Sequence, residues 1–116
     1  KILKLADGLG IRVAWLPFES EPPRCNLIVS TVPAGSLIRR AEDLAARANA
    51  VFDVVYDPWP TPLAVAGKIA GATVIDGLDL LAGQAVGQVQ LMTGYPVPMD
   101  VLRSTAQNGL AEHARL

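Results

Sequence analysis

Four short apolar runs, each ended by a turn residue, constrain the fold of this chain more than any other feature of its sequence. They cover residues 11–16, 26–32, 52–56 and 72–75. Segments with helical spacing alternate with these runs, and such an alternation is typical of βαβ units around a parallel sheet. Because the runs are apolar almost throughout, we expect strands that are covered on both faces.

Helical spacing of the apolar residues predicts four helices in the rest of the chain. They cover about residues 37–48, 62–70, 79–92 and 98–107. The first carries Arg40 and Asp43 opposite its apolar side, so that side should lie on the sheet as a crossover. Thr61 is a good N-cap for the second helix, because its hydroxyl can accept a hydrogen bond from a free backbone N–H. Asp79 is suited to cap the third helix, and Gly94 should end it.

The composition excludes several classes of protein. A length of 116 residues fits one domain, and 51% hydrophobic against 18% charged residues excludes a disordered tail. The formal net charge of −1 argues against nucleic-acid and anionic-membrane partners, and no apolar stretch is long enough to span a membrane. With a single cysteine, Cys25, and a single histidine, His113, no internal disulfide or Cys/His metal cluster can form. We expect a cytoplasmic protein without a metal site.

The N-terminal residues predict that the chain is a piece of a longer fold. Ile2 and Leu5 have the spacing of the closing turns of an amphipathic helix whose beginning is not present. A dinucleotide site uses a G-x-G-x-x-G turn after a strand, whereas the nearest match, Gly8 to Gly10, precedes a strand. The predicted fold class is α/β, a partial Rossmann-type doubly wound parallel sheet whose first βαβ portion is missing.

This fold class has a topological consequence for the run at 11–16. In the strand order 3-2-1-4-5-6, the run at 11–16 would be strand 3 and the run at 26–32 would be strand 4. If strands 1 and 2 are absent, a gap of two strands separates these runs in the sheet. We expect the missing half of the protein, or a second copy of the chain, to fill that gap.

Three segments carry specific residue patterns. Residues 53–63 read D-V-V-Y-D-P-W-P-T-P-L, residues 76–84 read D-G-L-D-L-L-A-G-Q, and residues 26–35 read N-L-I-V-S-T-V-P-A-G. These patterns resemble the C-terminal, cofactor-side part of shikimate dehydrogenases, and the S-T-V-P-A-G and Y-D-P-W-P-T-P stretches are similar to an actinobacterial-like subgroup. The resemblance implies that residues 1–116 are the C-terminal portion of an NADP-binding Rossmann-type domain, with the N-terminal substrate domain absent.

Tyr56 and Gln84 are the candidate substrate-binding residues. The Tyr56 phenol, at the end of a strand, can donate a hydrogen bond to a carboxylate or hydroxyl, although a packed aromatic would look the same. The Gln84 amide suits a polyhydroxylated ring, although Gln84 and Gln88 could also form a solvated helix face. The resemblance implies that Tyr56 contacts the carboxylate region of shikimate and Gln84 one of its hydroxyls. We expect both side chains to face one shared hollow.

The candidate cofactor-binding residues are Thr31, Val32, Val54, Gly77 and Leu80. Without a Cβ, Gly77 would let a flat ring approach the backbone between a strand end and a helix. The resemblance implies that Gly77 and the Leu80 side chain flank the nicotinamide, and that Val54 belongs to the same site. Thr31 and Val32 should line the cofactor groove through backbone and packing.

The resemblance also implies an activity. It implies an oxidoreductase that interconverts 3-dehydroshikimate and shikimate by hydride transfer, with NADP as cofactor. It implies no catalytic residue in this chain, because the family's catalytic Lys and Asp lie on the N-terminal substrate domain, so the chain alone should be inactive. The alternative is a noncatalytic α/β ligand-binding or interaction module that retains the fold, since a fold does not prove a function.

Overall fold

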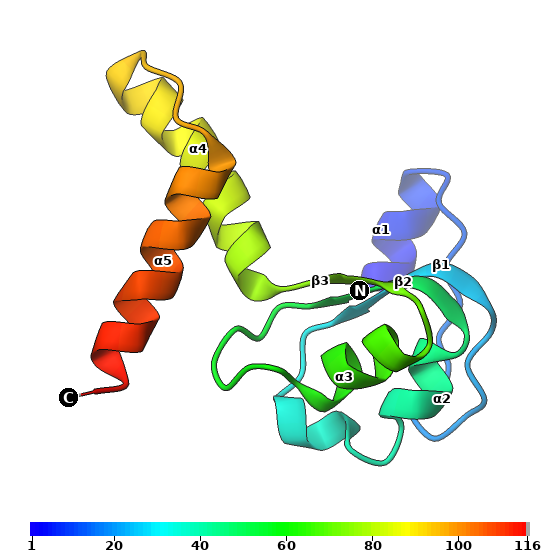
Figure 1. The fold of residues 1–116 in the computed structure, drawn as a ribbon. Helices are drawn as coiled ribbons and strands as arrows, with labels where there is room; N and C mark the ends of the chain where they lie inside the picture. The colour runs from blue at the N-terminus through cyan, green and yellow to red at the C-terminus, as the bar shows by residue number, and fades with distance from the viewer. Residues whose placement is uncertain (116) are drawn as a thin grey trace.

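The computed structural model describes residues 1–115 and contains a small parallel sheet with helices. Its elements are α1 (Ile2–Gly8), β1 (Cys25–Ser30), the 3-10 turn η1 (Ala34–Leu37), α2 (Ala41–Ala45), β2 (Ala48–Asp53), α3 (Pro62–Ile69), β3 (Thr73–Ile75), α4 (Gly77–Thr93) and α5 (Met99–His113). The α4–α5 hairpin projects from the body that holds the sheet (Figure 1). Within residues 1–115, no helix has the length and apolarity needed to cross a membrane.

The sheet has three parallel strands in the order β1-β2-β3. β1 and β2 are in register from the pair Cys25 and Ala48 to the pair Ser30 and Asp53, and β3 pairs with the middle of β2. Parallel strands in consecutive order form each half of a doubly wound sheet. The predicted fold class, a partial Rossmann-type α/β sheet, is confirmed.

The core lies between one face of the sheet and the helices α2 and α3. Leu37, Val51 and Leu63 form its buried centre, and Val51 and Leu63 are 0% exposed. α3 packs tightly on the sheet because it has a glycine at the contact: a Cβ on Gly67 would lie 2.6 Å from the Val51 Cγ2 atom. Ile28 of β1 packs against the same cluster.

The opposite face of the sheet is open at β1. Side chains alternate between the two faces of a strand, so Leu27 and Val29 point away from the side of Ile28. These two residues are 47% and 50% exposed. The expected covering of both faces is therefore not provided at β1 by the part of the chain that the structure describes.

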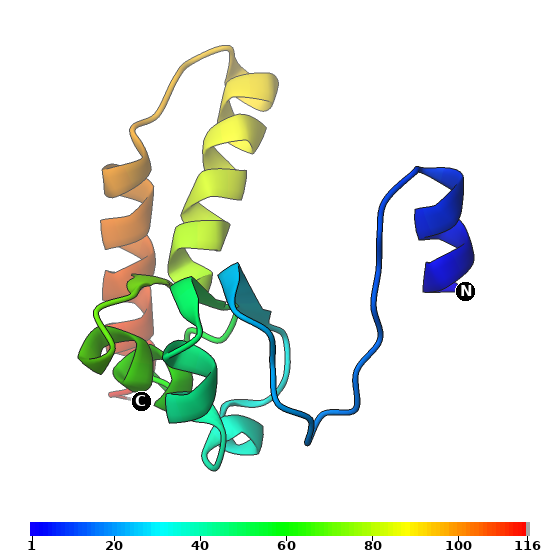
Figure 2. The same ribbon diagram turned by 90° about the vertical axis from the view of Figure 1, so that its right-hand side faces the viewer.

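The predicted strand at 11–16 is wrong. These residues form an irregular segment, and Ile11 and Trp15 are 56% and 77% exposed. A strand needs a neighbour that meets its backbone N–H and C=O groups, and none of the described residues supplies one here. Figure 2 shows α1 and this segment standing apart from the body.

Several element boundaries differ from the predicted ones. The predicted helix at 37–48 is divided into η1 and the short α2, and β2 starts at Ala48 rather than at residue 52. The reason is the register with β1, which pairs Ala48 with Cys25 and draws a stretch of small residues into the sheet. α5 does not stop at residue 107 but continues to His113.

The helix caps show why α3 and α4 begin where they do. Thr61 caps α3 as predicted, because its Oγ1 accepts from the Ala64 N–H at 3.2 Å. The cap of α4 is Asp76 and not Asp79: Asp76 Oδ1 accepts from the Asp79 N–H at 2.8 Å, and Asp79 Oδ2 accepts from the Asp76 N–H at 3.1 Å. Asp79 is thus the second half of a capping box. Gly94 ends α4 as predicted, with a φ of 76°.

Candidate functional site

The carboxyl ends of the three strands meet at one edge of the sheet, which positions several candidate residues together. Thr31 follows β1, Val54 follows β2, and Gly77 begins α4, separated from the end of β3 by one residue. The Val54 N–H donates to the Ser30 carbonyl at 3.1 Å, which continues the sheet by one bond. In open parallel sheets, ligands bind outside this edge, so it is the candidate site.

Gly77 is required at this edge by the chain's own packing. A Cβ on Gly77 would lie 2.2 Å from the Val54 carbonyl oxygen and 3.0 Å from the Tyr56 Cδ1 atom. The space beside Gly77 is therefore filled by the backbone that follows β2. This packing is a reason for the glycine in addition to the expected one, which was close approach of a flat ring to this backbone.

Thr31 and Val32 have different surroundings. Thr31 is exposed, whereas Val32 packs against the core cluster of Leu37, Val51 and Leu63. Val32 thus supports the strand end from inside, and Thr31 is accessible from outside.

Tyr56 lines a cavity of about 220 Å³ beside the start of α4. The side chain is 39% exposed. The other residues of this cavity come from the loop after β2, from α4 and from α5: Trp59, Asp76, Leu78, Arg103, Gln107 and Leu110. The phenol is therefore accessible and has polar and charged neighbours, as a ligand-binding tyrosine requires.

Gln84 lies in a different cavity, in the groove between α4 and α5. That cavity measures about 430 Å³, and Gln88, Leu102 and Thr105 also line it. Gln84 is exposed, and Leu80, one turn before it, is 39% exposed. The shared hollow expected for Tyr56 and Gln84 is not formed by the described residues, because Tyr56, in the loop after β2, and Gln84, in α4, line separate cavities.

A buried carboxyl group anchors the loop that carries Tyr56. Asp53, only 1% exposed, accepts from the Thr61 Oγ1–H at 2.8 Å and from the Val55 N–H at 3.3 Å. These bonds tie the end of β2 to the start of α3 and fix the loop between them. Asp53 is not among the predicted site residues, although it is the first residue of the 53–63 pattern.

Arg103 of α5 joins the site through two ion pairs that sequence analysis also missed. Its Nε donates to Asp79 Oδ1 and its Nη2 to Asp76 Oδ2, both at 2.6 Å. Burial raises the pKa of Asp79, but the Arg103 guanidinium and the Asp76 N–H outweigh it, so the net pKa of Asp79 is lower than usual. The Asp79 carboxylate raises the pKa of Arg103 in turn. Contacts across 24 and 27 residues carry no sequence signal.

The lowered pKa of Asp79 predicts an acid-sensitive contact between α4 and α5. Because the folded pKa lies below the unfolded one, the contribution to stability is present above the unfolded value of about 3.9 and is lost as the pH falls through the folded value. Acid titration followed by circular dichroism should show a loss of helix stability in this pH range. In the Asp79→Asn protein, this pH-dependent loss should be smaller. Identical acid profiles for the unaltered and Asp79→Asn proteins would contradict the assignment of this acid sensitivity to Asp79.

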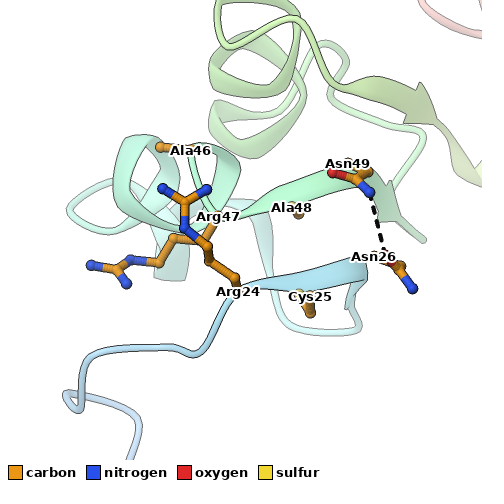
Figure 3. Close-up of a pocket in the computed structure, with 7 residues that line it drawn as sticks. All are labelled: Arg24, Cys25, Asn26, Ala46, Arg47, Ala48 and Asn49. Carbon is orange, nitrogen blue, oxygen red and sulfur yellow. Dashed lines mark hydrogen bonds between the residues drawn. The ribbon is translucent and has the colours of Figure 1, made fainter.

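A second polar cavity, of about 220 Å³, lies at the opposite ends of the strands (Figure 3). Arg24 and Arg47 line it, and the Asn49 Nδ2–H donates to Asn26 Oδ1 at 3.3 Å. The Arg47 guanidinium is already paired with Asp43 and with a second carboxylate. This cavity is at the amino ends of the strands, so it is not the candidate site. Among the described residues, no group of three potential metal ligands is found.

Comparison with known proteins gives one consistent result. No family model matches the chain. The chain is 36% identical over 91 residues to the shikimate dehydrogenase (NADP(+)) of Methanocella arvoryzae, a match that covers 73% of this chain and 33% of that protein. It is 32% identical over 114 residues to the enzyme of the same name from Synechococcus sp., covering 86% of this chain and 40% of that protein.

Solved structures give the same result for the fold. A shikimate 5-dehydrogenase from Mycobacterium fortuitum matches with a TM-score of 0.77 and 37% identity over 89% of this chain and 40% of that one. The Mycobacterium tuberculosis shikimate dehydrogenase matches with a TM-score of 0.64 and 42% identity over 74% of this chain and 32% of that one. The chain spans about a third of the length of the first curated relatives, 33% for the Methanocella protein.

Proposed function

This chain belongs to the shikimate dehydrogenase family, and from that premise we propose that it is the C-terminal, cofactor-side part of an NADP-dependent shikimate dehydrogenase. The complete protein would interconvert 3-dehydroshikimate and shikimate by hydride transfer. The chain contributes cofactor and substrate contacts but no catalytic residue, so it is inactive without the N-terminal substrate domain.

The observation that carries this proposal is the meeting of Thr31, Val54 and Gly77 at the carboxyl edge of a parallel sheet. The Ser30 hydroxyl at the same edge is buried and has no hydrogen-bond partner within residues 1–115. Buried polar atoms are nearly always paired, so this hydroxyl fits a polar group that the described residues do not contain.

The residues at this edge fit a nicotinamide nucleotide. In this proposal, Leu80 and the backbone of Gly77 flank the nicotinamide, Val54 lies beside them, and Thr31 and Val32 form the wall of the groove. NADP, when bound, supplies the ring that accepts or gives the hydride. The half-exposed Leu80 side chain would exclude water from one face of that ring.

Tyr56 and Gln84 contact the substrate in this proposal. The Tyr56 phenol donates to the carboxylate of shikimate, and the Gln84 amide bonds a ring hydroxyl. Since the two side chains line separate cavities, the substrate extends from one cavity to the other in this proposal. The N-terminal domain completes the site between the two cavities. The exposed apolar surface of the α4–α5 hairpin, where Leu91 and Met92 are 89% and 84% exposed, is available for that domain.

Shikimate affinity tests the substrate contacts. In the complete gene product, Tyr56→Phe and Gln84→Ala should each weaken shikimate binding about tenfold, because each removes one hydrogen bond to a polar ligand, about 1.4 kcal/mol. Calorimetric titration with shikimate measures the effect. Tyr95→Phe at the far end of the hairpin and Gln90→Ala, at an exposed position of α4 that lines neither cavity, are matched controls and should leave the affinity unchanged. Unchanged affinity in both test variants would contradict the assignment of Tyr56 and Gln84 as substrate contacts.

The second candidate function is a noncatalytic α/β binding module. The observation behind this alternative is that Tyr56 and Gln84 line two separate cavities and not one. A complete gene product that binds shikimate or NADP but shows no turnover would support this alternative.

A further inference from the structure

We propose that Arg103 is a positioning residue that holds the first turn of α4 and thereby places Gly77 and Leu80 at the cofactor edge. The effect of Arg103 on cofactor binding rests on the proposed function. It adds to that function a residue of α5, outside every segment that resembles a known pattern.

The geometry gives each carboxylate two separate tasks. In Asp76, Oδ1 caps the helix and Oδ2 accepts from Arg103; in Asp79, Oδ2 closes the capping box and Oδ1 accepts from Arg103. All four oxygens are thus engaged, and one planar guanidinium bridges both residues. The single ammonium of a lysine cannot reproduce this two-point contact.

The contacts of Arg103 with Asp76 and Asp79, called the clamp below, adjoin residues of the candidate site. Gly77 follows Asp76, and Leu80 follows Asp79, so both are within one residue of a clamped carboxylate. α5 has no buried residue, and Arg103 is its charged link to the base of α4. Without Arg103, the capping box remains, but α5 no longer fixes the direction in which α4 leaves β3.

The clamp also sets the charge beside Tyr56. Asp76 and Arg103 both line the Tyr56 cavity, so the guanidinium offsets the charge of the Asp76 carboxylate, which would otherwise face an anionic substrate alone. These two bonds hold Arg103 against Asp76 and Asp79, and its role in this proposal is to position α4.

The chain offers a matched control for Arg103. Arg47 also bridges two carboxylates, through an Nε bond of 3.1 Å to Asp43 and a short Nη2 contact with Glu21, but at the amino ends of the strands. The side chains of Arg47 and Arg103 are 27% and 30% exposed. Alanine at either position removes an arginine that bridges two carboxylates, at Arg47 together with a bond to the Pro22 carbonyl, and only one of the two positions adjoins the site.

The test compares Arg103→Ala, Arg103→Lys and Arg47→Ala in the complete gene product. We expect Arg103→Ala to raise the NADPH Kd about tenfold, measured by nucleotide fluorescence well below the Tm, and Arg103→Lys to recover only part of this loss. Arg47→Ala should leave the Kd unchanged. Equal effects of the two alanine variants on the Kd, or full recovery by lysine, would overturn the inference.

Hydrogen exchange separates this inference from the proposed function. Arg103→Ala should speed exchange of the amides in the first turn of α4, whereas Arg47→Ala should not. If the unaltered protein binds no NADPH, the proposed function fails, and the exchange result alone decides whether Arg103 positions α4. Unchanged exchange in Arg103→Ala would overturn the clamp itself.

Discussion

Replacing Gly77 with alanine is expected to destabilise the protein by about 3 kcal/mol, because the new methyl group overpacks a contact between two backbone segments. The Cβ would lie 2.2 Å from the Val54 oxygen and 2.9 Å from the Val54 carbonyl carbon. Neither atom can move without displacing the end of β2 or the first turn of α4. The same displacement should weaken NADPH binding, since both segments form the proposed cofactor edge.

Gly87→Ala is the matched control for this experiment, because Gly87 lies in the same helix and a Cβ there would have nothing within 4 Å. Alanine in an open helix position should stabilise the protein by up to about 1 kcal/mol. Denaturant unfolding of the complete gene product gives both free energies. A Gly77→Ala protein as stable as the Gly87→Ala protein would contradict the close approach of α4 to Val54.

Asp53→Ala is expected to lower the free energy of unfolding by about 2 to 4 kcal/mol, because it leaves two donors without their acceptor in a buried place. The donors are the Thr61 hydroxyl and the Val55 N–H. With both bonds lost, the loop between β2 and α3 is released, and Tyr56 with it. We therefore expect weaker shikimate binding as well as lower stability.

Asp43→Ala is the control for Asp53→Ala. Asp43 also accepts two hydrogen bonds, from Arg40 and Arg47, but on an exposed surface. Its loss should have a much smaller effect, because exposed ion pairs contribute little. Urea unfolding curves of the two variants, with shikimate titrations alongside, make the comparison. Equal losses of stability would contradict the structural role given to Asp53.

Much of the fold follows from local patterns in the sequence. The alternation of apolar runs and helical spacing correctly predicts a parallel α/β sheet, and Thr61 and Gly94 correctly mark helix ends. These signals depend only on neighbouring residues. The run at 11–16 has an equally apolar pattern but no partner strand within the described residues, and pairing partners are not encoded locally.

The candidate site was predictable only in part, because its contacts join distant positions. Thr31, Val54 and Gly77 meet at one edge because parallel strands end together. Arg103 is 24 residues from Asp79, so its clamp has no local pattern. The separate cavities of Tyr56 and Gln84 depend on the direction of α4, which the sequence pattern does not specify.

The measurement that tests the central claim most directly is reduction of NADP+ by the complete gene product on addition of shikimate. Our account predicts NADPH formation with the complete protein and none with residues 1–116 alone. A folded, complete gene product that forms no NADPH from shikimate would contradict it.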